Sequence, residues 1–162
     1  MARPELVALA ERLQRICLER SVTVAGGESC TGGLVADAIT DISGSSAYFH
    51  GSIVAYANEA KMSLLDVPGD VLAAHGAVSA QVARAMAEGA RNRLGAALGV
   101  GITGIAGPGG GSDDKPVGLT YIAVADEGGV DVRRYVWQGE REVNKVSSAE
   151  AALQLLIERA TG

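Results

Sequence analysis

The sequence predicts a single α/β domain over residues 1–162, built as a three-layer α/β/α sandwich around a mixed β-sheet. Three observations lead to this prediction. Short β-branched runs, typical of buried strands, alternate along the chain with longer segments of helical periodicity. Two later runs are joined by a tight glycine turn, which predicts an antiparallel hairpin. The length of 162 residues and a hydrophobic content of 48% suffice for one substantial core.

The first half of the chain is expected to hold two strands, each followed by a helix. Apolar residues at helical spacing predict the helices, and β-branched or continuous apolar runs predict the strands. The glycine-rich turn GGESCTGG separates the first strand from the helix after it. In order, the elements are a helix at 4–19, a strand at 21–25, a helix at 34–40, a strand at 51–57 and a short helix through EAKMSLL.

The second half is expected to contain a long helix, three strands and a final helix. Residues 66–76 carry proline and glycine and are interpreted as a turn. Ser79 is suited to cap the alanine-rich helix that follows, and Gly95 to end it. In order, the elements are a helix at 81–94, a strand at 97–103, hairpin strands at 117–126 and 130–138 joined by EGG, and a helix at 142–160.

Charge and composition argue against several classes of function. The formal net charge is −5 and the arginines are scattered among acids, which disfavours nucleic-acid binding. No apolar run approaches the roughly 20 residues that span a bilayer, and the first residues form no signal peptide, so a cytoplasmic protein without membrane contact is expected. Cys17 and Cys30 lack disulfide or metal spacing, and His50 and His75 are isolated, so no metal site is expected.

Two adjacent nucleophilic side chains, Ser29 and Cys30, lie in the glycine-rich turn at 26–33. A strand, a glycine turn and a helix in this order bring a ligand to the carboxyl end of the strand. A serine nucleophile needs a base, and a lysine can serve where burial favours its neutral amine. Tyr56 and Lys61 follow the next strand and can face the same edge. The pattern alone favours a plainer interpretation, in which Lys61 is solvated and Tyr56 packs in the core.

A second glycine-rich segment, TGIAGPGGG at 103–111, follows the third strand. Its backbone N–H groups can form an oxyanion hole or hold a phosphate, although by itself the segment is more typical of a flexible connection. Neither glycine segment has the spacing of a Walker loop or a dinucleotide fingerprint. The functional interpretation gains weight because three strand ends converge, each with small polar or reactive residues.

Several long motifs in fixed order resemble the CinA C-terminal domain family, whose enzymatic members are nicotinamide-nucleotide amidohydrolases, also called NMN deamidases. The resemblance covers essentially the whole chain. The family's larger members carry an additional N-terminal domain, so this chain is similar to the stand-alone form. The motifs are GESCTGG, GSIVAYANEAKMSLL, HGAVSAQVARAMAEGAR, TGIAGPGGG and KPVGLTYIAVA.

The resemblance implies hydrolysis of the carboxamide of nicotinamide mononucleotide (NMN) to nicotinate mononucleotide and ammonia, without a metal or cofactor, by a homo-oligomer. Ser29 matches the family's nucleophile and Lys61 its general base, with Tyr56 in support. Cys30 is expected to be a neighbour that fits the tight turn rather than the attacking atom. The positions that match the family's substrate-binding segments are Cys30, Thr31, Gly32, Gly33, Thr103, Gly104, Ile105 and Gly107.

Two positions depart from the family's pattern. Gly27 stands where the family usually has alanine, and Asn144 and Lys145 lie where it commonly carries a further arginine, a candidate phosphate contact. Lys145 can replace the charge of that arginine but not its bidentate fork. The alternative to an amidohydrolase is therefore a non-catalytic nucleotide-binding or regulatory protein that keeps the pocket.

Overall fold

The computed structural model describes residues 3–162 and shows helices interleaved with strands. The long helices have one apolar face each, and the central strands consist almost entirely of buried residues. The elements are α1 (Pro4–Arg20), β1 (Val24–Glu28), α2 (Leu34–Thr40), the 3-10 turn η1 (Ser45–Ala47), β2 (Phe49–Val54), α3 (Asn58–Leu65), α4 (Gly69–His75), α5 (Ala80–Leu94), β3 (Leu98–Gly104), β4 (Leu119–Asp126), β5 (Gly129–Val136) and α6 (Arg141–Thr161).

The strands form one five-stranded mixed sheet in the order β2-β1-β3-β4-β5. β1 pairs in parallel with both β2 and β3, while β4 and β5 run antiparallel as the predicted hairpin. The carboxyl ends of β1, β2 and β3 therefore meet at one edge of the sheet, as expected for ligand-binding α/β proteins.

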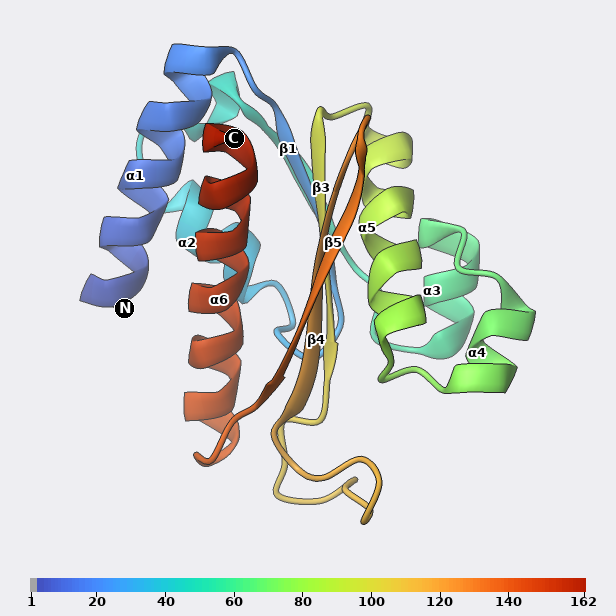
Figure 1. Cartoon of the computed structure of the whole chain (residues 1–162). Helices are drawn as coiled ribbons and strands as arrows, with labels where there is room; N and C mark the ends of the chain where they lie inside the picture. The colour runs from blue at the N-terminus through green and yellow to red at the C-terminus, as the bar shows by residue number, and fades with distance from the viewer. Residues whose placement is uncertain (1–2) are drawn as a thin grey trace.

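Helices cover both faces of the sheet, which confirms the predicted three-layer sandwich (Figure 1). One face carries α1, α2 and α6, and the other carries α5 with α3 and α4 outside it. The larger core cluster lies under α1, α2 and α6, and the second lies between α5, α3 and α4. Within residues 3–162, the structure has no helix with both the length and the apolar character needed to cross a bilayer.

Three of the predicted elements differ from the structure in their bounds or type. The second strand was predicted at 51–57, but β2 is Phe49–Val54, and residues 55–57 connect it to α3. The first strand was predicted at 21–25, but β1 is Val24–Glu28, because the sheet pairs Gly26 and Gly27 of the supposed turn with β2 and β3. Residues 66–76 were predicted as a turn, but they contain the helix α4. Proline and glycine at its start are typical of turns, and packing stabilises the helix, since Leu72 belongs to the second core cluster and Val71 packs against that cluster.

Glycines in β3 let α5 lie close to the sheet. Gly99 and Gly101 face α5, and a Cβ on either would overlap the helix backbone, at Ala87 O for Gly99 and at Ala83 O for Gly101. Val100 and Ile102 alternate to the other face and join the larger core cluster. The low aromatic content of 4% is consistent with layers packed at such short range.

Gly101→Ala is expected to lower the free energy of unfolding by about 2 kcal/mol, because α5 must shift to admit the methyl group. Urea denaturation followed by circular dichroism measures the change. Gly109→Ala is the matched control, since a Cβ on Gly109 meets no atom within 4 Å. Equal stability of the two variants would contradict the close packing of α5 on β3.

Candidate active site

The ends of the three parallel strands bring Ser29 and Lys61 together. Ser29 directly follows β1, and its N–H donates to Ile102 O in β3 at 3.0 Å, so the strand geometry continues through it. Side chains alternate along a strand, so Ser29 points to the α3 side of the sheet and its neighbour Glu28 to the α2 side. This alternation aims the Ser29 hydroxyl at α3, which carries Lys61.

The Lys61 amine lies 3.0 Å from the Ser29 hydroxyl and donates to its Oγ. The same Nζ donates to the main-chain oxygen of Tyr56 at 2.8 Å. Lys61 is only 2% exposed, and its burial lowers the pKa of the amine below the ordinary 10.5. Desolvation thus favours the neutral amine, the form that can accept a proton from Ser29.

The plainer interpretation of this segment is wrong for both residues. Lys61 is buried rather than solvated, and Tyr56 is 62% exposed rather than packed in the core. Because α3 begins at Asn58, the chain turns between the two and folds Lys61 back under the end of β2. Tyr56 therefore touches Lys61 through its carbonyl oxygen and leaves its ring at the mouth of the site.

A cleft of about 200 Å³ opens above the Ser29–Lys61 pair. Six of the positions singled out in the sequence line this cleft, and five do not. Thr31, Gly32 and Gly33 lie in the turn behind Ser29. Ile105 precedes the lining residue Ala106, and Gly107 lines a neighbouring hollow. The cleft is lined by Ser29, Cys30, Tyr56, Asn58, Lys61, Ala77, Val78, Thr103, Gly104, Ala106 and Arg141.

Cys30 lies beside Ser29 with its thiol in a tightly packed position. A Cβ on Gly104 would lie 3.1 Å from the Cys30 Sγ, so the absence of a side chain there makes room for the thiol. Desolvation raises the pKa of Cys30 to about 11, which keeps the thiol protonated at neutral pH. Since the thiolate is the nucleophilic form of cysteine, this environment favours Ser29 over Cys30 as the attacking group.

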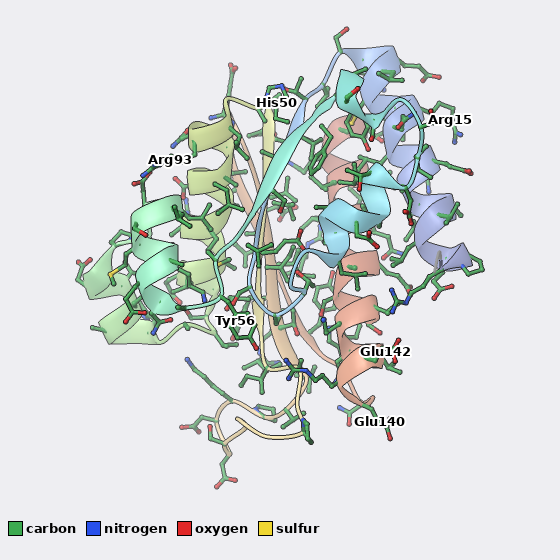
Figure 2. The ribbon with its side chains drawn as sticks, turned by 180° about the vertical axis from the view of Figure 1, so that it is seen from behind. Arg15, His50, Tyr56, Arg93, Glu140 and Glu142 are labelled. Atoms are coloured by element: carbon green, nitrogen blue, oxygen red, sulfur yellow. The ribbon has the colours of Figure 1, made fainter. Side chains whose placement is uncertain are left out.

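Arg141 is the functional candidate that the sequence reasoning missed. From the first turn of α6, its guanidinium donates to Gly107 O at 2.8 Å and to the Tyr56 hydroxyl at 3.3 Å. It also lines two further hollows, of about 570 and 410 Å³, that adjoin the cleft. Figure 2 shows Tyr56 in the same half of the molecule as Glu140 and Glu142, which mark the start of α6. In the sequence, Arg141 was indistinguishable from the other scattered arginines.

The departures in the last helix have separate structural roles. Asn144 is 2% exposed and joins two loops: its Nδ2 donates to Ala106 O at 3.0 Å and to Gly139 O at 2.8 Å, and its Oδ1 accepts from the Gly139 N–H at 3.0 Å. Lys145 turns towards the glycine turn, with Nζ 3.8 Å from the position of a Cβ on Gly32. Lys145 thus places a cation beside the cleft, in the hollow it shares with Arg141.

A mixed sheet flanked by helices, with a serine–lysine pair in a cleft at the ends of its parallel strands, defines this chain as an α/β protein with a potential nucleophilic site. The sequence pattern of the CinA C-terminal domain matches residues 6–160. The chain belongs to the CinA C-terminal domain family.

Solved structures and curated relatives support this membership. The crystal structure of competence/damage inducible protein CihA from Agrobacterium tumefaciens is 39% identical, with a TM-score of 0.92 over 98% of this chain and 97% of that chain. A CinA superfamily protein from Klebsiella pneumoniae is 30% identical, with a TM-score of 0.92 over 96% and 98% of the two chains. A CinA-like protein of Geobacter sulfurreducens is 55% identical over 145 residues, which are 90% of this chain and 35% of the relative. The chain spans about a third of the length of the curated relatives it matches.

Proposed function

We propose that this protein hydrolyses the carboxamide of NMN to nicotinate mononucleotide and ammonia. The observation that carries the proposal is the buried Lys61 amine 3.0 Å from the Ser29 hydroxyl. A buried amine with a lowered pKa next to a serine has the requirements of a nucleophile and its base. The cleft of about 200 Å³ is smaller than the roughly 300–1,000 Å³ of sites that enclose a whole ligand. It therefore suits the reacting ring of a nucleotide, with the ribose phosphate outside.

The proposed reaction proceeds through an acyl-enzyme. Neutral Lys61 accepts the proton of Ser29, whose oxygen attacks the carboxamide carbon. Lys61 then returns the proton to the leaving nitrogen, and ammonia departs. A water molecule, activated by the same amine, attacks the ester that remains and releases the carboxylate product and Ser29. Each proton that Lys61 accepts is thus passed on within the same half-reaction.

Main-chain donors next to Ser29 are the candidates to stabilise the oxyanion. Cys30 lines the cleft beside Ser29, and within residues 3–162 no hydrogen bond joins its N–H to another residue. Main-chain N–H groups beside the nucleophile commonly form an oxyanion hole, and one such donor lowers the activation barrier by about 3 kcal/mol. Gly104, across the cleft, has no side chain that would hinder the approach of the substrate.

The cations beside the cleft support a phosphorylated substrate. Arg141 and Lys145 border the same hollow of about 410 Å³, together with Leu34 and the ion pair of Arg3 and Glu142. A substrate whose ring enters the cleft extends its ribose and phosphate towards this hollow. Two cations at one position favour a dianionic group over a neutral one.

The direct experiment is ammonia release from NMN by the purified protein, coupled to mass detection of nicotinate mononucleotide. Release that depends on both Ser29 and Lys61 supports the proposed reaction. NMN that binds but is not hydrolysed would identify the chain as a nucleotide-binding module. Hydrolysis that survives removal of both side chains would place the reaction at another site.

The pH dependence of kcat/KM for NMN tests the base. Only neutral Lys61 accepts the serine proton, so kcat/KM is expected to rise with pH and to level off above the Lys61 pKa. Because burial lowers this pKa, half of the maximum is reached below 10.5. The profile is measured from about pH 6 to about pH 10, with circular dichroism as a control for folding. A rate that falls throughout this range would exclude a lysine base.

Lys145→Ala is expected to raise the KM for NMN about tenfold and to change kcat less than about threefold, because a charge-assisted phosphate contact is worth about 1.5 kcal/mol or more. Lys145→Arg is expected to restore the KM. The nucleoside that lacks the phosphate provides the internal control, since its KM should not respond to the substitution. An equal effect on nucleoside and nucleotide would show that Lys145 does not contact the phosphate.

A further inference from the structure

Glu28, the last residue of β1, is a fully buried carboxylate with an exposure of 0%. It accepts four hydrogen bonds, two at each oxygen. Its Oε1 accepts from Thr31 Oγ1 at 2.7 Å and Val35 N at 3.0 Å, and its Oε2 accepts from Ala36 N at 3.1 Å and Ser52 Oγ at 2.9 Å. Both oxygens are therefore fully used as acceptors.

The donors around Glu28 are all uncharged. Among residues 3–162, no lysine, arginine or histidine forms an ion pair with this carboxylate. Burying a carboxylate without a cation costs several kcal/mol before its hydrogen bonds are counted. If the side chain at this position only filled space, an apolar residue would make the folded protein more stable. The position of Glu28 next to Ser29 suggests a different reason for its presence.

The four donors belong to the segments that surround the candidate nucleophile. Thr31 lies in the turn after Ser29, Val35 and Ala36 form the first turn of α2, and Ser52 lies in β2. Ser29 itself is attached to this turn, since its carbonyl oxygen accepts from the Gly32 N–H at 3.0 Å. Glu28 thus ties the turn, the helix behind it and the neighbouring strand to the residue that precedes Ser29.

We propose that Glu28 is a positioning residue that holds the Ser29 hydroxyl in line with the Lys61 amine. It acts from the opposite face of the sheet, does not line the cleft and makes no contact with substrate. The inference rests on the proposed role of Ser29 as a nucleophile. A nucleophile displaced by about 1 Å can lose about 100-fold in rate, so a carboxylate that fixes the turn has a large effect without touching the substrate.

Glu28→Gln is the sharpest substitution because it keeps the shape and removes one acceptor. Val35 and Ala36 contribute main-chain N–H groups, which can only donate. Whichever way the glutamine amide is turned, its NH₂ group faces one of these two N–H groups. The hydroxyls of Thr31 and Ser52 can rotate to adapt, but the two peptide groups cannot. The substitution therefore releases one side of the turn.

The experiment compares wild type, Glu28→Gln and Leu156→Ala in two reactions. The first is NMN hydrolysis, and the second is sulfonylation of Ser29 by phenylmethylsulfonyl fluoride, in which the serine oxygen displaces fluoride from sulfur. Leu156→Ala is the control, because Leu156 is a buried core residue of α6, about 22 Å along the helix from Arg141. It destabilises the fold without touching the turn.

Glu28→Gln is expected to lower kcat for NMN about 100-fold with KM changed less than about threefold, and to slow the labelling of Ser29 by a similar factor. In Leu156→Ala, Ser29 should be labelled at the wild-type rate per folded molecule. If Glu28→Gln does not fold, Ser52→Ala removes one donor from Oε2 and should slow labelling about three- to tenfold.

The proposal is overturned if Ser29 is labelled at the wild-type rate in folded Glu28→Gln, or in Ser52→Ala where that variant takes its place. It is also overturned if Leu156→Ala slows the labelling equally, or if Ser29 of the wild-type protein does not react at all. Failure of the proposed function gives a different result. In that case NMN is not hydrolysed by wild type, while the labelling of Ser29 still depends on Glu28.

Discussion

Ser29→Ala is expected to lower kcat for NMN hydrolysis by about 10⁴-fold or more, while NMN still binds. The substitution removes the attacking oxygen, and loss of the nucleophile in a comparable serine hydrolase costs about a million-fold in kcat. It removes no charge, and Ser29 is 8% exposed, so little of the cleft changes. The dissociation constant for NMN is expected to stay within about threefold, because the cations near the cleft are untouched.

Single-turnover ammonia release and calorimetric NMN binding measure the two effects separately. Comparison with Cys30→Ala identifies which of the neighbouring side chains attacks. If the thiol were the nucleophile, Ser29→Ala would keep its activity and Cys30→Ala would abolish it. The raised pKa of Cys30, about 11, predicts the opposite, because the thiol stays protonated.

Lys61→Met is expected to abolish hydrolysis, with a loss in kcat of at least about 1,000-fold, without loss of stability. Methionine follows the aliphatic course of the lysine but supplies no base. Because the amine is buried at 2% exposure, its charged form is disfavoured, and its removal should leave the free energy of unfolding at neutral pH unchanged or higher. Activity would then be lost while stability is kept, which is the result expected for a group that serves the reaction and does not stabilise the fold.

The pH dependence of stability provides a second measurement on the same variant. The folded pKa of Lys61 lies below its unfolded value, so between the two values the unfolded chain binds more protons and the stability of wild type rises with pH. The stability difference between wild type and Lys61→Met should therefore shrink as pH rises towards 10.5. Lys115→Met, a lysine outside the cleft, serves as the control. A Lys61→Met protein that keeps a tenth of the wild-type kcat would contradict the assignment of the base.

The order of elements was predictable because it depends on local patterns. Helical spacing predicted α1, α5 and α6 to within a few residues, and the EGG turn predicted the hairpin of β4 and β5. The predicted Ser79 cap is confirmed, since its side chain accepts from the Val82 N–H. The failures lie where packing overrides local preference, at the glycines within β1 and at the short helix α4, which only neighbouring elements stabilise.

Within the candidate site, the sequence pointed to Ser29 and Lys61 but gave no reason to single out Glu28 or Arg141. Ser29 is conspicuous because a nucleophile in a glycine turn is chemically distinctive. Glu28 and Arg141 belong to residue types that are common on surfaces, and their roles depend on partners far along the chain, such as Ser52 and Tyr56. A single sequence contains no signal for such contacts.

The sequence by itself determined the fold class and the strand ends that converge, because each follows from composition and periodicity over a few neighbouring residues. The resemblance to the CinA C-terminal domain family, rather than the local pattern, singled out Lys61 as the partner of Ser29. Only the tertiary structure decided that Lys61 is buried 3.0 Å from Ser29 and that Tyr56 is exposed. The physical reason is that desolvation, and with it the lowered pKa of Lys61, arises from atoms that distant segments bring around the amine.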